Sequence, residues 1–122
     1  MEKIENIAER IESEIKEKDI YFAWQLDDKF NIIEISDGVS KILGYYPNEI
    51  ISTNFTDYML KQEARFFLKE ISDYNGKYKS IFNITNIFKR KDKTHIVLET
   101  KGKSLIDTNG NITGFEGLTF YR

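Results

Sequence analysis

Isoleucines recur at three- and four-residue steps through the first 18 residues, and most of the positions between them are charged. This spacing predicts an amphipathic helix with one narrow apolar stripe. A helix of this length is only marginally stable by itself in water, so the stripe must pack against something. We expect it to pair with the same helix of a second chain, and the alternative is packing against its own domain. The stripe consists of Ile4, Ile7, Ile11 and Ile15.

The spacing of apolar residues changes to two after residue 19, which predicts β-strands. The segments IYFAWQL and FNIIEI are separated by a polar turn at residues 27–29 and together predict a hairpin. Three more alternating segments follow later and predict a three-stranded meander, with turns at residues 92–93 and 107–110. In the first of these three, one face carries Ile81, Asn83, Thr85 and Ile87, and the other carries Phe82, Ile84 and Phe88.

Helical signals fill the part of the chain between the two groups of strands. VSKIL predicts a short helix that ends at Gly44, and Pro47 fits the first turn of the next one. Residues 54–57 predict one further turn. Residues 59–74 predict a longer helix, which ends before Asn75-Gly76. The apolar stripe of this longer helix is Ala64, Phe67, Leu68 and Ile71.

The order of elements is therefore a helix, two strands, short helices, a longer helix and three strands. A chain of 122 residues is long enough for one domain and too short for two ordinary ones. The order predicts a single α+β domain with an antiparallel sheet.

The composition excludes several classes of function. A net charge of −2 gives no general attraction to nucleic acid or to an anionic membrane, so we expect neither partner. No apolar run is long enough to span a bilayer, and the charged first residues do not resemble a signal peptide. The chain has no cysteine, which excludes disulfides, thiolate metal sites and cysteine catalysis and favours a reducing, cytoplasmic location.

Few residues are candidates for chemistry. His95, the single histidine, falls at a hairpin, where we expect it to be solvated. Asp27 and Asp28 are adjacent in a turn, where carboxylates usually cap backbone N–H groups and do not act as an acid–base pair. The basic run KRKDK, residues 89–93, is interpreted as a solvated turn and not as an anion or nucleic-acid site, because it is short and spans a hairpin. We therefore predict no catalytic residue, no metal site and no enzymatic activity in this chain.

Two spaced motifs match a known family. DDKFNIIEISDGVSKILGYYPNEIISTNFTDYM contains a strand, an aspartate turn, a second strand, a short helix that ends in Leu-Gly-Tyr, and a turn that begins with proline. KRKDKTHIVLETKGKSLIDTNGNITGFEGL contains basic residues and an aspartate at a hairpin, a strand and an Asp-x-x-Gly-x-x-x-Gly pattern. Over residues 20–122 the chain resembles the PAS sensor-domain family, in particular the domains attached to sensor histidine kinases. The matching residues are Asp27, Ile32, Ile35, Ile42, Leu43, Gly44, Tyr45, Pro47, Glu49, Ile50 and Phe55, then Arg90, Lys91, Asp92, Asp107, Gly110, Gly114 and Gly117.

The resemblance implies a PAS-like fold, which is a five-stranded antiparallel sheet with short helices and one longer helix over one face. Residues 20–122 would form this domain, and residues 1–19 would form an N-terminal amphipathic helix for dimerisation and signal transmission. Phe30, Ser52 and Lys93 stand where turn glycines are common in the family, and we expect the turns to accept them at modest cost.

In this family a cavity between the helices and the sheet can hold a small molecule. The apolar residues that would line it are equally compatible with a solid core that holds no ligand. Asn83, Thr85, Thr100 and Ser104 lie at strand positions that would face either a ligand or solvent. The candidate lining residues are Phe22, Trp24, Leu26, Ile33, Ile35, Ile42, Phe67, Ile71, Phe82, Ile84 and Phe115.

The resemblance gives no support to two of the family's cofactors. Haem-binding members carry a histidine on or near the long helix, and residues 59–74 contain none. Light-sensing members bind a flavin covalently through a cysteine, which this chain lacks. We expect neither haem nor a covalently bound flavin, and the cofactor stays unassigned.

The function implied by the resemblance is that of a cytoplasmic sensory module, active as a homodimer. Such a module binds a small molecule or a protein partner and regulates a linked output domain, here a histidine kinase of a two-component system. The chain ends just before the Asp-Ile-Thr that often follows in the family, so we expect an output domain beyond residue 122. The main alternative is a dimerisation or protein-interaction module that binds no ligand. A small α+β enzyme is a more distant alternative, because it would need ionisable residues inside the cavity.

Overall fold

A computed structural model of the chain describes residues 20–74 and 81–121. The predicted N-terminal helix, with Ile4, Ile7, Ile11 and Ile15, lies outside the described residues and stays a prediction.

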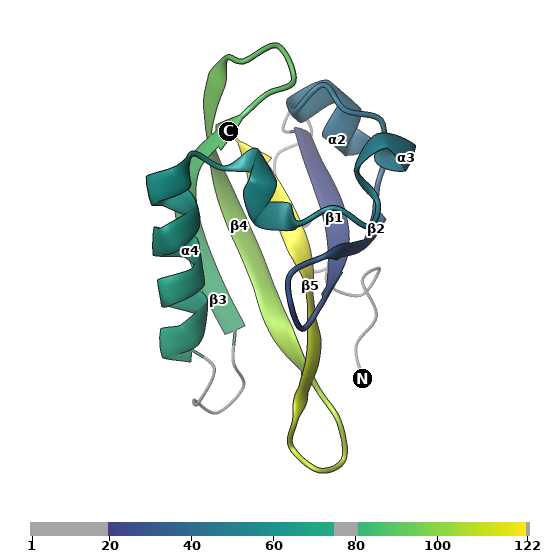
Figure 1. The fold of residues 1–122 in the computed structure, drawn as a ribbon, viewed down its shortest axis with the longest axis vertical. Coiled ribbons are helices and arrows are strands. Elements are labelled where there is room, and N and C mark those ends of the chain that lie inside the picture. The colour runs from purple at the N-terminus through teal and green to yellow at the C-terminus, as the bar shows by residue number, and fades with distance from the viewer. Residues whose placement is uncertain (1–19, 75–80, 122) are drawn as a thin grey trace.

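The described residues contain one five-stranded antiparallel sheet, as predicted (Figure 1). Its strand order is β2-β1-β5-β4-β3, so the first and last strands of the domain lie side by side near the middle of the sheet. The strands are β1 (Ile20–Asp27), β2 (Ile32–Ile35), β3 (Ile81–Lys89), β4 (His95–Ile106) and β5 (Ile112–Tyr121).

Helices lie between β2 and β3 in the sequence and cover one face of the sheet. Figure 1 shows the longest of them, α4, beside β3, and α2 and α3 beside β1 and β2. The elements are α2 (Gly38–Ile42), α3 (Pro47–Ile50), the 3₁₀ helix η1 (Phe55–Tyr58) and α4 (Lys61–Tyr74).

The longer helix begins two residues later than its apolar pattern predicts. Met59 forms an isolated antiparallel bridge with Phe88, and the Leu60 backbone N–H donates to the Ile87 carbonyl at 3.4 Å. These two residues are therefore held in extended pairing with β3, and the helix begins at Lys61.

The predicted stripe on this helix is also too wide. Phe67 and Ile71 are buried and Ala64 is partly buried, but Leu68 is 40% exposed. α4 packs mainly along β3 and next against η1, and Leu68 lies outside the core cluster that these elements share. The prediction that Leu68 faces the interior is wrong.

A bulge in β2 changes which of its isoleucines faces inward. Trp24 pairs with Ile35, but the register shifts before Leu26, which pairs with Ile32. The extra residue is Ile33, which is 47% exposed, whereas Ile32 is buried. A bulge inserts one residue and reverses the alternation beyond it, so the prediction that Ile33 lines the interior is wrong.

The face of the sheet turned away from the helices also carries buried apolar side chains. Ala23 and Leu118 face each other across β1 and β5, and Phe120 lies two residues further along β5. These three residues do not belong to the main core cluster on the helix side.

Candidate functional site

The interior between the helices and the sheet is the place where the sequence predicted a ligand cavity. Of the predicted lining residues, Ile33 is exposed and Ile35 is half-buried against the core. All the others are at most 2% exposed, so they share one interior. That they line a ligand cavity stays a prediction.

Aromatic rings fill the middle of this interior. The Phe55 ring centre lies 5.2 Å from that of Trp24 and 5.8 Å from those of Phe67 and Phe88. Such distances are those of rings in direct contact. The contacts continue from Phe67 to Phe82, from Phe82 to Phe115, and from Phe115 to the stacked ring of Phe30.

Three of these aromatic residues were missed as lining residues from the sequence. Phe88 alternates with Phe82 and Ile84 on β3, so its position could have been inferred from that pattern. Phe30 and Phe55 lie in a turn and at the start of a 3₁₀ helix, where no alternation indicates which side chains point inward.

Trp24 packs against a pair of glycines at the centre of the sheet. Gly102 and Gly117 face each other on β4 and β5. A Cβ atom on Gly117 would lie 2.8 Å from Trp24 Cζ2, and one on Gly102 would lie 3.0 Å from Trp24 Cη2. The glycines therefore provide the space that the indole occupies.

The polar groups beneath the indole bind one another. Trp24 Nε1 donates to Thr119 Oγ1 at 2.9 Å, and Thr119 Oγ1 lies 3.0 Å from Thr100 Oγ1. Of the four polar strand residues singled out in the sequence, Thr100 and Ser104 are buried, whereas Asn83 and Thr85 are exposed on the other face. Thr100 therefore belongs to the hydrogen-bonded chain that begins at the Trp24 indole and passes through Thr119.

Asn86 is a buried polar residue that the sequence reasoning missed. It is 2% exposed, and its Nδ2 lies 3.3 Å from Met59 Sδ and 3.4 Å from the Glu63 carbonyl. Within the described part of the chain, its Oδ1 has no hydrogen-bond partner. It shares the inward face of β3 with Ile84 and Phe88, and this alternation could have predicted its burial.

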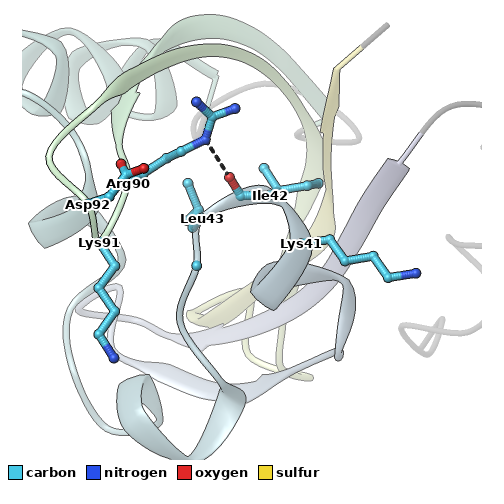
Figure 2. Close-up of a pocket in the computed structure, with 7 residues that line it drawn as sticks. Lys41, Ile42, Leu43, Arg90, Lys91 and Asp92 are labelled. Carbon is cyan, nitrogen blue, oxygen red and sulfur yellow. Dashed lines mark hydrogen bonds between the residues drawn. The ribbon is translucent and has the colours of Figure 1, made fainter.

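A surface cleft of about 470 Å³ is lined by the end of α2 and by the β3–β4 hairpin. In Figure 2, Arg90 reaches across it to the end of α2, and Lys41 points away from the hairpin. Arg90 Nε donates to the Ile42 carbonyl at 3.0 Å, and the Lys91 backbone N–H donates to the Leu43 carbonyl at 2.8 Å. The hairpin thereby caps the last carbonyls of α2.

Lys91 also connects the hairpin to α3. Its Nζ lies 2.6 Å from Glu49 Oε2 and 5.7 Å from the centre of the Tyr45 ring. The hydrogen bond from Lys91, followed by one from the Tyr46 backbone, lowers the pKa of Glu49, and the same pairing raises the pKa of Lys91. The KRKDK run is therefore a structural hairpin that binds the helical segment.

The remaining chemical candidates have structural roles or are exposed. Asp27 accepts hydrogen bonds from the backbone N–H groups of Lys29 and Asn31, both at 2.9 Å, so it closes the β1–β2 turn. Burial raises the pKa of Asp27, but the bonds from Asn31 and Lys29 together lower it. His95 is exposed at the start of β4.

Among residues 20–74 and 81–121, no group of three or more His, Cys, Asp or Glu side chains is placed to hold a metal ion. Within those ranges, no helix is both long enough and apolar enough to cross a membrane.

A family model described as the PAS fold matches residues 32–119, which is most of the chain. The chain belongs to the PAS family. Domains of this family are generally sensory or signalling modules without catalytic activity of their own. No curated protein sequence matches the chain.

Solved PAS structures share the fold at low sequence identity. The PAS domain of a protein from Colwellia psychrerythraea is 12% identical, with a TM-score of 0.74 over 92% of this chain and 94% of that one. Drosophila melanogaster Cycle PAS-B with bound ethylene glycol is 14% identical, with a TM-score of 0.72 over 82% and 99%. The N-terminal domain of a diguanylate cyclase with PAS/PAC sensor from Marinobacter aquaeolei is 12% identical, with a TM-score of 0.66 over 82% and 93%.

The positions where this PAS domain departs from the family's glycines adopt the backbone conformation that glycine favours. Phe30, Ser52 and Lys93 have φ angles of 71°, 73° and 76°. These turns therefore keep the left-handed geometry without the residue that adopts it most easily.

Proposed function

We propose that this PAS domain is a signalling module that regulates a linked output domain through contacts between protein chains, and that its interior is filled by its own side chains. The observation that carries the proposal is the position of Trp24. Its indole occupies the space above Gly102 and Gly117, and its N–H group is already bound to Thr119. A ligand at the centre of the sheet would have to displace this ring.

Residues 1–19 are the proposed transmission element, and residues 20–122 the proposed sensory domain. In the sequence, residues 1–19 directly precede β1, which begins at Ile20 and carries Trp24. A change in the aromatic interior would therefore reach the helix along a single strand. The two copies of the helix in a homodimer would pair through Ile4, Ile7, Ile11 and Ile15.

A histidine kinase is the proposed output domain, in a cytoplasmic two-component system. The family likeness of both sequence motifs supports this choice. The similar Marinobacter domain is named as part of a diguanylate cyclase, so the output class is a separate question from the role of the domain.

Pairing of the predicted helix is tested with one charge on the stripe and one opposite it. Ile11→Glu places a carboxylate in the proposed seam, and we expect light scattering to report a monomer where the parent chain is a dimer. Ser13→Glu adds the same charge on the opposite side of the predicted helix and should leave the dimer intact. Equal behaviour of the two variants would overturn the paired helix.

A small-molecule sensor is the second candidate function, and Asn86 is the observation that favours it. An unpaired buried amide oxygen costs about 1–3 kcal/mol, and a ligand or water that donates to it would recover this loss. Trp24 is the sole tryptophan and is fully buried, so its fluorescence reports on the same interior.

The two candidates differ in what the purified chain retains. If the interior is filled by its own side chains, an extract of the purified chain contains no small molecule in stoichiometric amount. Adding this extract back to the chain then leaves the Trp24 emission unchanged. A stoichiometric compound that shifts the emission of the parent chain would establish the sensor. In that case we expect Asn86→Leu to weaken its binding.

A further inference from the structure

Two residues with positive φ bound the segment that includes α3. Gly44 has a φ angle of 86° and Ser52 one of 73°. We call residues 45–51, between them, the lid. Ile50 of the lid is buried in the core cluster, so displacement of the lid would uncover the aromatic interior.

On the β2 side, backbone hydrogen bonds attach the lid. The Ser52 N–H donates to the Ile32 carbonyl at 2.8 Å, and the Ile32 N–H donates to the Thr53 carbonyl at 2.8 Å. These bonds lie at the end of the lid and hold it to an edge strand of the sheet.

On the hairpin side, a side chain attaches the lid. Lys91 Nζ binds Glu49 Oε2 at 2.6 Å and lies over the Tyr45 ring. The backbone bond from Lys91 goes to Leu43, which precedes Gly44 and belongs to the end of α2. Among the described residues, no backbone hydrogen bond joins residues 45–51 to the hairpin.

The cleft of Figure 2 lies beside this weaker attachment. Gly44 lines it together with Arg90 and Lys91, and a Cβ atom on Gly44 would lie 3.4 Å from Lys91 Cβ. The first bounding residue of the lid is therefore in contact with the residue that fastens it, next to open space.

We propose that Lys91 and Glu49 form a latch, and that the lid opens on the hairpin side and exposes the Trp24 interior when this ion pair breaks. The β2 side, held by backbone bonds, stays attached and acts as the hinge. The inference stands whether the interior is filled by its own side chains or binds a small molecule, because it concerns access and not occupancy.

Acrylamide quenching of Trp24 fluorescence tests the latch, because this is the sole tryptophan and is fully buried. In the full chain, Lys91→Gln and Glu49→Gln should each raise the quenching constant roughly two- to five-fold, the range expected from losing one exposed ion pair. Glu49→Gln keeps a side-chain oxygen that can accept from the Tyr46 backbone N–H, so it removes the ion pair and not this second bond. The double variant K91Q/E49Q should raise the quenching constant no further than either single variant, because both changes break the same pair. Lys93→Gln, in the same hairpin but outside the ion pair, should leave it unchanged.

Hydrogen exchange separates lid opening from general loss of stability. The latch predicts faster exchange confined to residues 45–51 in each single variant. A rise spread equally over the five strands would overturn it, because that pattern reports global unfolding. Additive effects of the two changes in K91Q/E49Q would also overturn it, since the residues would then act through something other than their pairing.

Discussion

The surroundings of Trp24 could be predicted only in part from the sequence. The alternation of β1 predicted that its side chain points inward, and it does. The space that its indole occupies depends on two glycines that are distant in sequence and become neighbours only when β4 pairs with β5. Single-segment patterns carry no information on that pairing, so the glycine pair could not be predicted.

Gly117→Ala tests this site. The new Cβ would lie 2.8 Å from Trp24 Cζ2 and would clash with the Lys101 carbonyl oxygen, and both must move. We expect the free energy of unfolding in urea to fall by about 3 kcal/mol. Gly110→Ala is the control, because its Cβ meets nothing within 4 Å and only its positive φ opposes the change. A loss for Gly117→Ala no larger than that for Gly110→Ala would contradict the tight packing of the indole.

Lys93 and Phe30 separate backbone strain from side-chain packing. Both have positive φ, but Lys93 is exposed, whereas Phe30 stacks on Phe115 with ring centres 4.6 Å apart. We expect Lys93→Gly to raise the free energy of unfolding by up to about 1 kcal/mol, because glycine relieves the strain at some cost in chain entropy. Phe30→Gly should lower it by about 2–3 kcal/mol, because the lost contacts outweigh that relief. Thermal and urea unfolding of both variants measure this, and stabilisation by Phe30→Gly would contradict the proposed packing.

At the scale of elements, regular alternation and helical spacing were sufficient to predict all five strands and the longer helix. The alternation of β3, with Phe82, Ile84 and Phe88 on one face, was predicted correctly because that strand pairs with β4 without a register shift. The alternation of β2 was predicted wrongly, because its bulge depends on how two strands fit together and not on the composition of either strand. The predicted start of α4 was wrong for a similar reason, because pairing of Met59 with β3 overrides local helical preference.

The bulge predicts opposite effects for neighbouring isoleucines. Ile32→Ala should lower the free energy of unfolding by about 2–4 kcal/mol, because it leaves a cavity in the core. Ile33→Ala should change it by less than about 0.5 kcal/mol, because the side chain lies largely in solvent. Urea unfolding of the two variants is the measurement. A larger loss for Ile33→Ala than for Ile32→Ala would contradict the bulge and support the regular alternation that the sequence alone suggested.

At the scale of the whole molecule, the stability of the domain should decrease in acid. The pKa values of Asp27, Glu49 and Asp92 are all lowered in the folded chain, through hydrogen bonds that their ionised forms accept. A carboxylate with a lowered pKa stabilises the fold above its ordinary value, and this contribution is lost as pH falls through the folded value. For Glu49 the loss therefore begins near its ordinary value of 4.5 and continues below it.

Glu49→Gln isolates one part of this dependence. The variant cannot titrate at this position, so its unfolding midpoint should fall less between about pH 5 and pH 3 than that of the parent chain. Lys91→Gln should have a similar effect, because it removes the group that lowers the pKa of Glu49 most strongly. Parallel pH curves for the parent chain and both variants would contradict a role for this pair in the acid response.

The family and the fold could be predicted from the sequence because two motifs fix the turns on either side of the helices. The interior could be predicted only as a set of apolar residues. Whether such residues enclose space or fill it depends on how rings such as Phe55 and Trp24 pack together, at 5.2 Å between centres, and this packing is a property of the assembled domain.

Native and denaturing mass spectrometry of the freshly purified chain tests the central claim most directly, because together they report the oligomeric mass and any retained small molecule. We expect a native dimer whose mass is twice that of the denatured chain, with no additional compound. A compound present in the native mass and absent from the denatured one would contradict the self-filled interior. A native monomer would contradict signalling through pairing of the chains.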